Sequence, residues 1–91
     1  MGHTIYYITE IDEWGKFLKF MKDVCNGLGL EAVAEKERLT ILPGCMGVEP
    51  LKIPRKGYGF AKTNKVEPCH SVYRLVLYSL ASFGSVSVWE D

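Results

Sequence analysis

The chain has 91 residues, of which 47% are hydrophobic and 24% charged, and its 11 lysine and arginine residues balance its 11 aspartate and glutamate residues. This length suits one domain with a single core, residues 1–91, and the composition excludes a disordered chain. The balanced charge excludes an overall field that would steer the whole molecule to nucleic acid or to a membrane.

Residues 4–9, T-I-Y-Y-I-T, predict the first strand, because β-branched and aromatic residues favour strands. Both faces of this strand carry bulky side chains. We therefore expect it at the centre of a sheet.

A helix is expected next, with Asp12 as its N-cap and with its end at Gly27 or Gly29. Apolar residues recur at helical spacing from Trp14 to Leu28 and predict one broad buried face. Lysine, aspartate and asparagine residues fill the opposite face, so this is an amphipathic helix against a core.

Two short strands are predicted at 31–34 and 38–42, separated by the polar turn 35–37, and Pro43 to Gly47 then form a tight loop. A second hairpin is expected to follow. Its arms are 51–53 and 58–63, and Pro54-Arg55-Lys56-Gly57 make its turn.

A second helix is predicted to begin near Pro68 and to end at Gly84. Its expected inner stripe is Val72, Leu75, Val76, Leu80 and Phe83. The other faces of this helix are only mildly polar, which indicates deep burial or a covering partner. Residues 85–89, S-V-S-V-W, alternate and predict the last strand, with Trp89 on the face opposite Val86 and Val88.

The order of these elements predicts an α+β, two-layer sandwich. In it, one antiparallel sheet carries two helices on one face, in the ferredoxin-like βαββαβ order with an extra β-hairpin before the second helix.

The stretch from Val48 to Lys65 is the first candidate for a binding site. Between Glu49 and Glu67 it carries basic residues and no acidic ones, and it holds two closely spaced aromatics. The candidate ligand-binding residues are Lys52, Arg55, Lys56, Tyr58, Phe60, Lys62 and Lys65, with Cys69 and His70 near them.

The sequence K-G-Y-G-F-A at Lys56 to Ala61 resembles the first ribonucleoprotein motif of the RNA recognition motif family. The resemblance implies that Tyr58 and Phe60 stack on bases of single-stranded RNA while Lys56 contacts phosphate. Residues 4–7 on the first strand would supply a further aromatic. The alternative is that both rings pack under the second helix, with the lysines as solvated protection of a sheet edge.

The three cysteines, Cys25, Cys45 and Cys69, are an odd number without framework spacing. The first residues do not resemble a signal peptide, and no apolar run approaches the roughly 20 residues that a membrane helix needs. We therefore expect free thiols in a cytoplasmic protein without membrane contact.

Cys69-His70 lies at the expected start of the second helix, where the helix dipole can activate a thiol as a nucleophile. Successive helical residues point about 100° apart, so His70 is poorly placed as the base for Cys69. Catalysis by Cys69 is one hypothesis, and a structural role for this cysteine is the alternative.

Cys45, Cys69 and His70 are candidate zinc ligands, with His3 or Cys25 as a further ligand. The chain has no C-x-x-C pair, and Cys25 lies on the apolar helix stripe. The sequence therefore predicts no metal site and no cofactor.

Together these features predict a binding or interaction module without catalytic activity, which uses the basic aromatic hairpin 52–65. Self-association as a homodimer or a protein partner is expected from the apolar second helix. Single-stranded RNA binding by Tyr58, Phe60 and Lys56 is the first alternative, and a thiol-dependent enzyme using Cys69 is the second.

Overall fold

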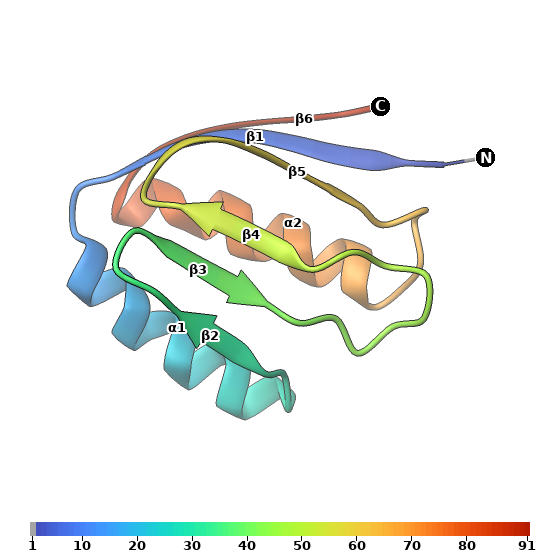
Figure 1. Cartoon of the computed structure of the whole chain (residues 1–91), viewed down its shortest axis with the longest axis horizontal. Helices are drawn as coiled ribbons and strands as arrows, with labels where there is room; N and C mark the ends of the chain where they lie inside the picture. The colour runs from blue at the N-terminus through green and yellow to red at the C-terminus, as the bar shows by residue number, and fades with distance from the viewer. Residues whose placement is uncertain (1) are drawn as a thin grey trace.

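Residues 2–91, which the computed structural model describes, form a mixed α+β structure with two helices and two three-stranded antiparallel sheets. The elements in chain order are β1 (Thr4–Ile11), α1 (Trp14–Leu28), β2 (Ala32–Ala34), β3 (Arg38–Ile41), β4 (Leu51–Pro54), β5 (Lys56–Lys62), α2 (Cys69–Ser79), the 3-10 turn η1 (Leu80–Ser82) and β6 (Gly84–Glu90) (Figure 1). The mixed α+β class expected from the sequence is confirmed.

The strands divide into the sheet β5-β1-β6 and the sheet β2-β3-β4, so the single sheet predicted above is wrong. β1 lies between β5 and β6, antiparallel to both, which confirms its expected central position. Both neighbouring strands are distant from β1 in the chain, since Thr4 pairs with Lys62 of β5 and Ile5 pairs with Glu90 of β6.

The predicted hairpin of β4 and β5 contains the right strands but the wrong pairing. β4 pairs with β3, whereas β5 pairs along its whole length with β1. Side chains of β1 bond to β4 where β4 and β5 have no backbone hydrogen bonds to each other. The hydroxyl of Tyr7 donates to the carbonyl of Lys52, and the hydroxyl of Thr9 donates to the carbonyl of Pro54, each over 2.6 Å. These bonds satisfy backbone acceptors that would otherwise need a strand partner.

The core lies between the two sheets and the helices. Its fully buried side chains come from β1, α1, β3, β4 and α2, and the largest of them are Tyr7, Tyr73 and Phe17. The hydroxyl of Tyr73 donates to the carbonyl of Glu49 over 2.8 Å, so α2 is bonded to the segment that precedes β4. Burial raises the pKa of Tyr73 to about 12.

Helix α1 ends as predicted and begins differently. Gly29 takes the left-handed conformation (φ 70°) at its end, which glycine adopts at little cost. At its start, Asp12 does not cap the helix: Glu13 occupies the cap position without a side-chain bond. The amides of Asp12 and Glu13 instead donate to the carbonyl of Phe83, each over 3.0 Å, which joins the start of α1 to the end of η1.

Helix α2 is rotated from the predicted orientation. Its buried residues are Cys69, His70, Tyr73, Val76 and Leu77, whereas Leu75 of the predicted inner stripe is 71% exposed. Two long-range bonds account for this orientation. The hydrogen bond of Tyr73 to Glu49 and the disulfide of Cys69 hold the side of α2 that carries Cys69 and Tyr73 against the core. None of the helices within residues 2–91 has the length and apolar character to cross a membrane.

Candidate functional site

The outer face of the sheet β5-β1-β6 carries a group of exposed aromatic side chains. Tyr58 and Phe60 on β5 are 57% and 55% exposed, and they lie opposite Ile8 and Tyr6 on β1. Tyr6 in turn pairs with Trp89 on β6, which is 44% exposed. The alternative in which Tyr58 and Phe60 pack under the second helix is therefore wrong.

The four rings form one surface. Tyr6 stacks on Trp89 with 5.9 Å between ring centroids and an interplanar angle of 14°. Phe60 lies 6.4 Å from both Tyr6 and Tyr58, and Tyr58 lies 6.4 Å from Trp89. We call the surface made by Tyr6, Ile8, Tyr58, Phe60 and Trp89 the aromatic face.

The inner face of β5 explains why its large side chains point outward. Gly57, Gly59 and Ala61 alternate with Tyr58 and Phe60 and carry little or no side chain. The ring of Tyr7 lies against Gly59, its partner in the register, and takes the space that a larger residue would need. The small residues therefore face the core and the aromatic residues face outward.

Charges of both signs surround the aromatic face. Lys56 and Lys62 lie on the same side of β5 as its two rings, and both are exposed. Lys56 is 3.7 Å from the carboxylate of Glu10 on β1, and Asp91 accepts a hydrogen bond of 3.3 Å from the Tyr6 hydroxyl. The field over this face is therefore weakly basic at most, in keeping with the balanced charge of the chain.

A groove of about 440 Å³ adjoins the aromatic face between β4 and β5. It is open because the two strands do not form a ladder, and Tyr7 lies at its base. Lys52 from β4 lines one side of this groove, and Tyr58 and Phe60 line the other. The structure therefore brings Lys52, Tyr58 and Phe60 together around this groove, and Lys56 and Lys62 lie on the same side of β5 as the two rings.

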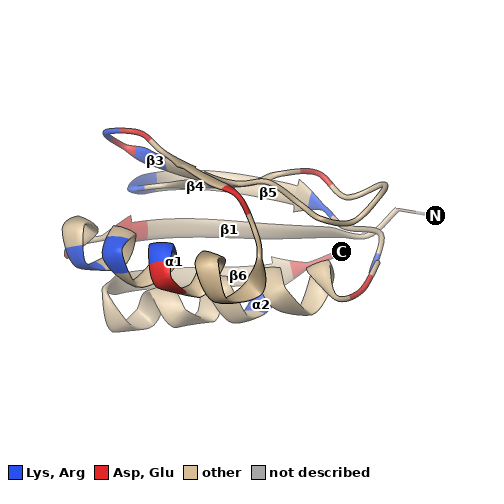
Figure 2. Cartoon of the chain, turned by 90° about the horizontal axis from the view of Figure 1, so that it is seen from below, with Lys and Arg blue, Asp and Glu red and all other residues tan. Residues whose placement is uncertain are grey.

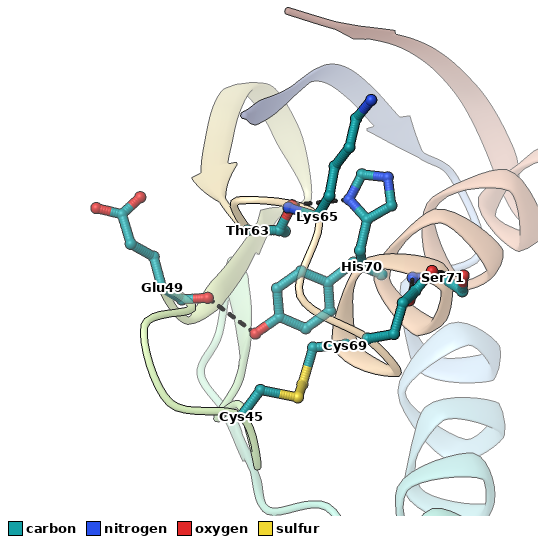
Figure 3. Close-up of a disulfide and its surroundings, with 9 residues drawn as sticks. Cys45, Glu49, Thr63, Lys65, Cys69, His70 and Ser71 are labelled. Carbon is teal, nitrogen blue, oxygen red and sulfur yellow. Dashed lines mark hydrogen bonds between the residues drawn. A yellow bond between two sulfur atoms is a disulfide. The ribbon is translucent and has the colours of Figure 1, made fainter. Parts of the chain in front are cut away.

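Arg55 and Lys65 are not part of that region. Arg55 lies in the bend between β4 and β5, where its amide donates to the carbonyl of Glu37 (2.8 Å) and its carbonyl accepts from Ile11 (2.7 Å). Lys65 lies in the turn after β5 with a φ of 57°, and its side chain points outward near His70 (Figure 3).

Cys45 and Cys69 form a disulfide that links the loop before β4 to the first turn of α2 (Figure 3). The expectation of free thiols is therefore wrong for two of the three cysteines, and Cys25 alone is free and buried. The bonded Cys69 has no free thiol that could act as a nucleophile in this structure. Neither Cys45 nor Cys69 can ligate zinc in this state.

His70 belongs to a separate cluster that contains His3 and Glu90. His70 is buried, its Nδ1 lies 2.7 Å from the hydroxyl of Thr63, and its Nε2 lies 3.2 Å from Oε1 of Glu90. Nε2 of His3 lies 2.7 Å from the same carboxylate oxygen. Because successive residues of a strand point to opposite faces, Glu90 lies on the other side of β6 from Trp89.

The surroundings of Glu90 favour its charged form. The hydrogen bond from His3 and the nearby charge of Arg74, whose Nε lies 3.0 Å from Oε2, hold the pKa of Glu90 below its ordinary value, against the opposite effect of partial burial. Residue types alone did not reveal this cluster, because its members come from the two ends of the chain and from α2.

Sequence reasoning named most of the aromatic face but did not assemble it. The alternation of β6 placed Trp89 opposite Val86 and Val88, and the first strand was expected to supply an aromatic. The missing information was the register, which sets Tyr6 between Phe60 and Trp89.

No family model, no curated protein and no solved structure matches the chain.

Proposed function

We propose that the chain is a binding module whose aromatic face binds single-stranded nucleic acid, with RNA as the first ligand to test. The observation that carries this proposal is a surface of four aromatic rings from three adjacent strands, with neighbouring centroids 5.9 to 6.4 Å apart: Tyr58, Phe60 and Trp89 are exposed and Tyr6 is half-buried between them. A base stacked on an exposed aromatic ring contributes roughly 1–3 kcal/mol, and the π-face of every base can do so.

The charges on the edge of the aromatic face suit a backbone that lies across it. Lys52, Lys56 and Lys62 lie beside the rings and offer three cations to phosphates. Glu10 already pairs with Lys56, so we expect only about two phosphate contacts. For single strands this predicts a slope of log K against log salt of about −1.4, which marks stacking as the main source of affinity.

The intrinsic fluorescence of the chain offers a direct test. Of the two tryptophans, Trp89 lies on the aromatic face and Trp14 is buried, so a bound base is expected to quench Trp89 alone. Titration with mixed-sequence single-stranded RNA and DNA oligonucleotides should give saturable quenching. Tyr58→Ala and Phe60→Ala should each weaken binding by about 5- to 150-fold, the loss of one stacked base.

Tyr78→Ala is the matched control, because Tyr78 is an exposed aromatic on α2, away from the aromatic face. It should leave binding unchanged. Absence of quenching with every oligonucleotide pool at low salt, or an equal loss in all three variants, would contradict the proposal and leave a protein partner as the occupant of this face.

Self-association is the second candidate function, and a different surface favours it. A groove of about 250 Å³ between α1 and α2 is lined by apolar side chains and one serine, among them Phe20, Leu28 and Leu75. Figure 2 shows that α2 carries almost no charge along its length, in contrast to α1. A homodimer through this surface would bury an apolar patch that water now covers. Sedimentation equilibrium tests this candidate.

We infer that the topology is the ferredoxin-like one, with an added hairpin. β5 and β6 are both antiparallel to β1, so β5, α2 and β6 form a split βαβ unit around it. β4 packs beside β5, and β3 and β2 extend the order beyond it. In this arrangement the two helices share one face and leave the aromatic face open.

A further inference from the structure

We propose that His3, His70 and Glu90 form a binding site for a divalent transition-metal ion, with zinc as the ion that best fits the ligands. One ligand atom from each of the three residues lies within 4.8 Å of the other two. Both Nε2 atoms approach the same carboxylate oxygen of Glu90, at 2.7 Å from His3 and 3.2 Å from His70.

The ligand set has the chemistry of a zinc site with one open position. Imidazole nitrogen and carboxylate oxygen bind Zn²⁺ at about 2.0–2.2 Å, and sites with three protein ligands leave the fourth position to water. Ligand atoms of such a tetrahedral ion lie about 3.3 Å apart. The two observed separations, 2.7 and 3.2 Å, lie just below this value, and all three ligand atoms lie within 4.8 Å of one another, so an ion can replace the two contacts to Glu90 with small side-chain movements.

Thr63 supports the ring of His70 on the side away from the site. Its hydroxyl lies 2.7 Å from Nδ1, and the residue is fully buried. The hydroxyl can accept a hydrogen bond from Nδ1–H when Nε2 binds a metal, and it can donate a hydrogen bond to Nδ1 when Nε2 carries the proton. Such outer contacts orient metal-binding histidines in many proteins.

Arg74 fixes the carboxylate in a similar way. Its Nε lies 3.0 Å from Oε2 of Glu90 and leaves Oε1 directed at the two histidines. The cation of Arg74 also offsets the negative charge of Glu90 that a metal ion would meet. Because Oε2 is bonded to Arg74, the metal would bind Glu90 through the single oxygen Oε1.

The ligands come from three separate parts of the fold: the residue before β1, the first turn of α2 and the last residue of β6. A bound ion would add a cross-link between the start of β1, the end of β6 and the first turn of α2. Because a metal that binds only the folded chain stabilises it by mass action, zinc should raise the melting temperature.

The experiment uses the full chain without a polyhistidine tag, after treatment with a chelator. Titration with Zn²⁺ should give one site per chain, and Co²⁺ should give the visible absorption bands of a tetrahedral nitrogen and oxygen site. His3→Ala and Glu90→Gln should each lower the affinity at least tenfold and abolish the zinc-dependent rise in melting temperature. Thr63→Val should weaken binding roughly tenfold, since the loss of an outer contact costs about that much.

Glu67→Gln is the matched control, since this carboxylate lies three residues before His70 but accepts its hydrogen bonds from Ser71. It should bind zinc like the unaltered chain, and so should Tyr58→Ala, which lies on the aromatic face. His3→Ala removes a partly exposed side chain at the start of the chain and is expected to fold, which circular dichroism checks. Binding without one-to-one stoichiometry, or binding unaffected by His3→Ala, would overturn the proposal and leave a hydrogen-bonded cluster without a metal.

Discussion

Gly59 sits under the ring of Tyr7, and this contact sets which face of β5 looks outward. A Cβ at this position would lie 2.5 Å from Cε2 of Tyr7 and 2.8 Å from its Cζ. The Tyr7 ring cannot move aside easily, because it is fully buried and its hydroxyl is bonded to the carbonyl of Lys52. Burial also raises the pKa of this tyrosine, so it keeps its donated proton at any ordinary pH.

We therefore expect Gly59→Ala to lower the free energy of unfolding by about 1–3 kcal/mol, the usual cost of added volume in a packed site. Urea denaturation followed by circular dichroism measures the loss. Gly27→Ala is the control, because nothing lies within 4 Å of its added Cβ and the residue is helical. This control should be neutral or stabilising by up to about 1 kcal/mol. Equal stability of both variants would contradict the steric role of Tyr7.

The outward direction of Tyr58 and Phe60 could be predicted only in part. Alternation puts the two rings on one face of the strand, and that part was correct. A strand with large residues on one face and glycines on the other normally turns the large face inward. Here a residue from the neighbouring strand, Tyr7, fills the space above the glycines, and no local pattern in residues 56–61 reveals that.

At the scale of elements, the rotation of α2 shows a similar limit. Its apolar residues surround most of the helix, so periodicity could not choose between the stripe of Leu75 and the stripe of Tyr73. The choice is made by long-range bonds, the disulfide of Cys45 with Cys69 and the hydrogen bond of Tyr73 to Glu49 (Figure 3). The disulfide also bears on the cytoplasmic location, which was predicted from free thiols, because two of the three cysteines are not free.

The disulfide should contribute measurably to stability. It closes a loop with a sequence separation of 24, for which the loss of chain entropy in the unfolded state amounts to about 3 kcal/mol. We expect the double variant Cys45→Ser and Cys69→Ser to unfold at correspondingly lower urea concentration. A reductant should destabilise the unaltered chain and Cys25→Ala by the same amount and should leave the double variant unchanged. A reductant effect that persists in the double variant would contradict this assignment.

At the scale of the whole molecule, two exposed apolar surfaces compete as explanations of self-association: the aromatic face and the groove between α1 and α2. Leu75 in the groove is the most exposed large apolar side chain of either helix. If the groove is the dimer interface, Leu75→Glu should convert a dimer into a monomer in sedimentation equilibrium at micromolar concentration. Met46→Glu is the control, since Met46 is 96% exposed in a loop. A monomeric unaltered chain would end the dimer hypothesis.

The division into two sheets is also a property of the whole chain. The sequence predicted every strand within a few residues, and it predicted the central place of β1. It could not show that β4 and β5 do not pair with each other. The hydroxyls of Tyr7 and Thr9, more than 40 residues earlier in the chain, donate to the β4 carbonyls that a hairpin partner would otherwise bond. Pairings of this kind depend on tertiary contacts and leave no local signal.

The central position of β1 has a consequence for how the molecule folds. This strand precedes the other elements in the chain, yet both of its neighbours, β5 and β6, come from the second half of the 91 residues. Until they arrive, its two edges and the apolar side chains of Ile5 and Tyr7 stay open to other chains. Bringing these distant strands together costs loop-closure entropy before any stabilising contact forms. Folding should therefore be slow for a protein of this size, and the chain should be most prone to aggregation before β5 and β6 have paired with β1. The aromatic face, which needs all three strands, is complete only when the final residues are in place.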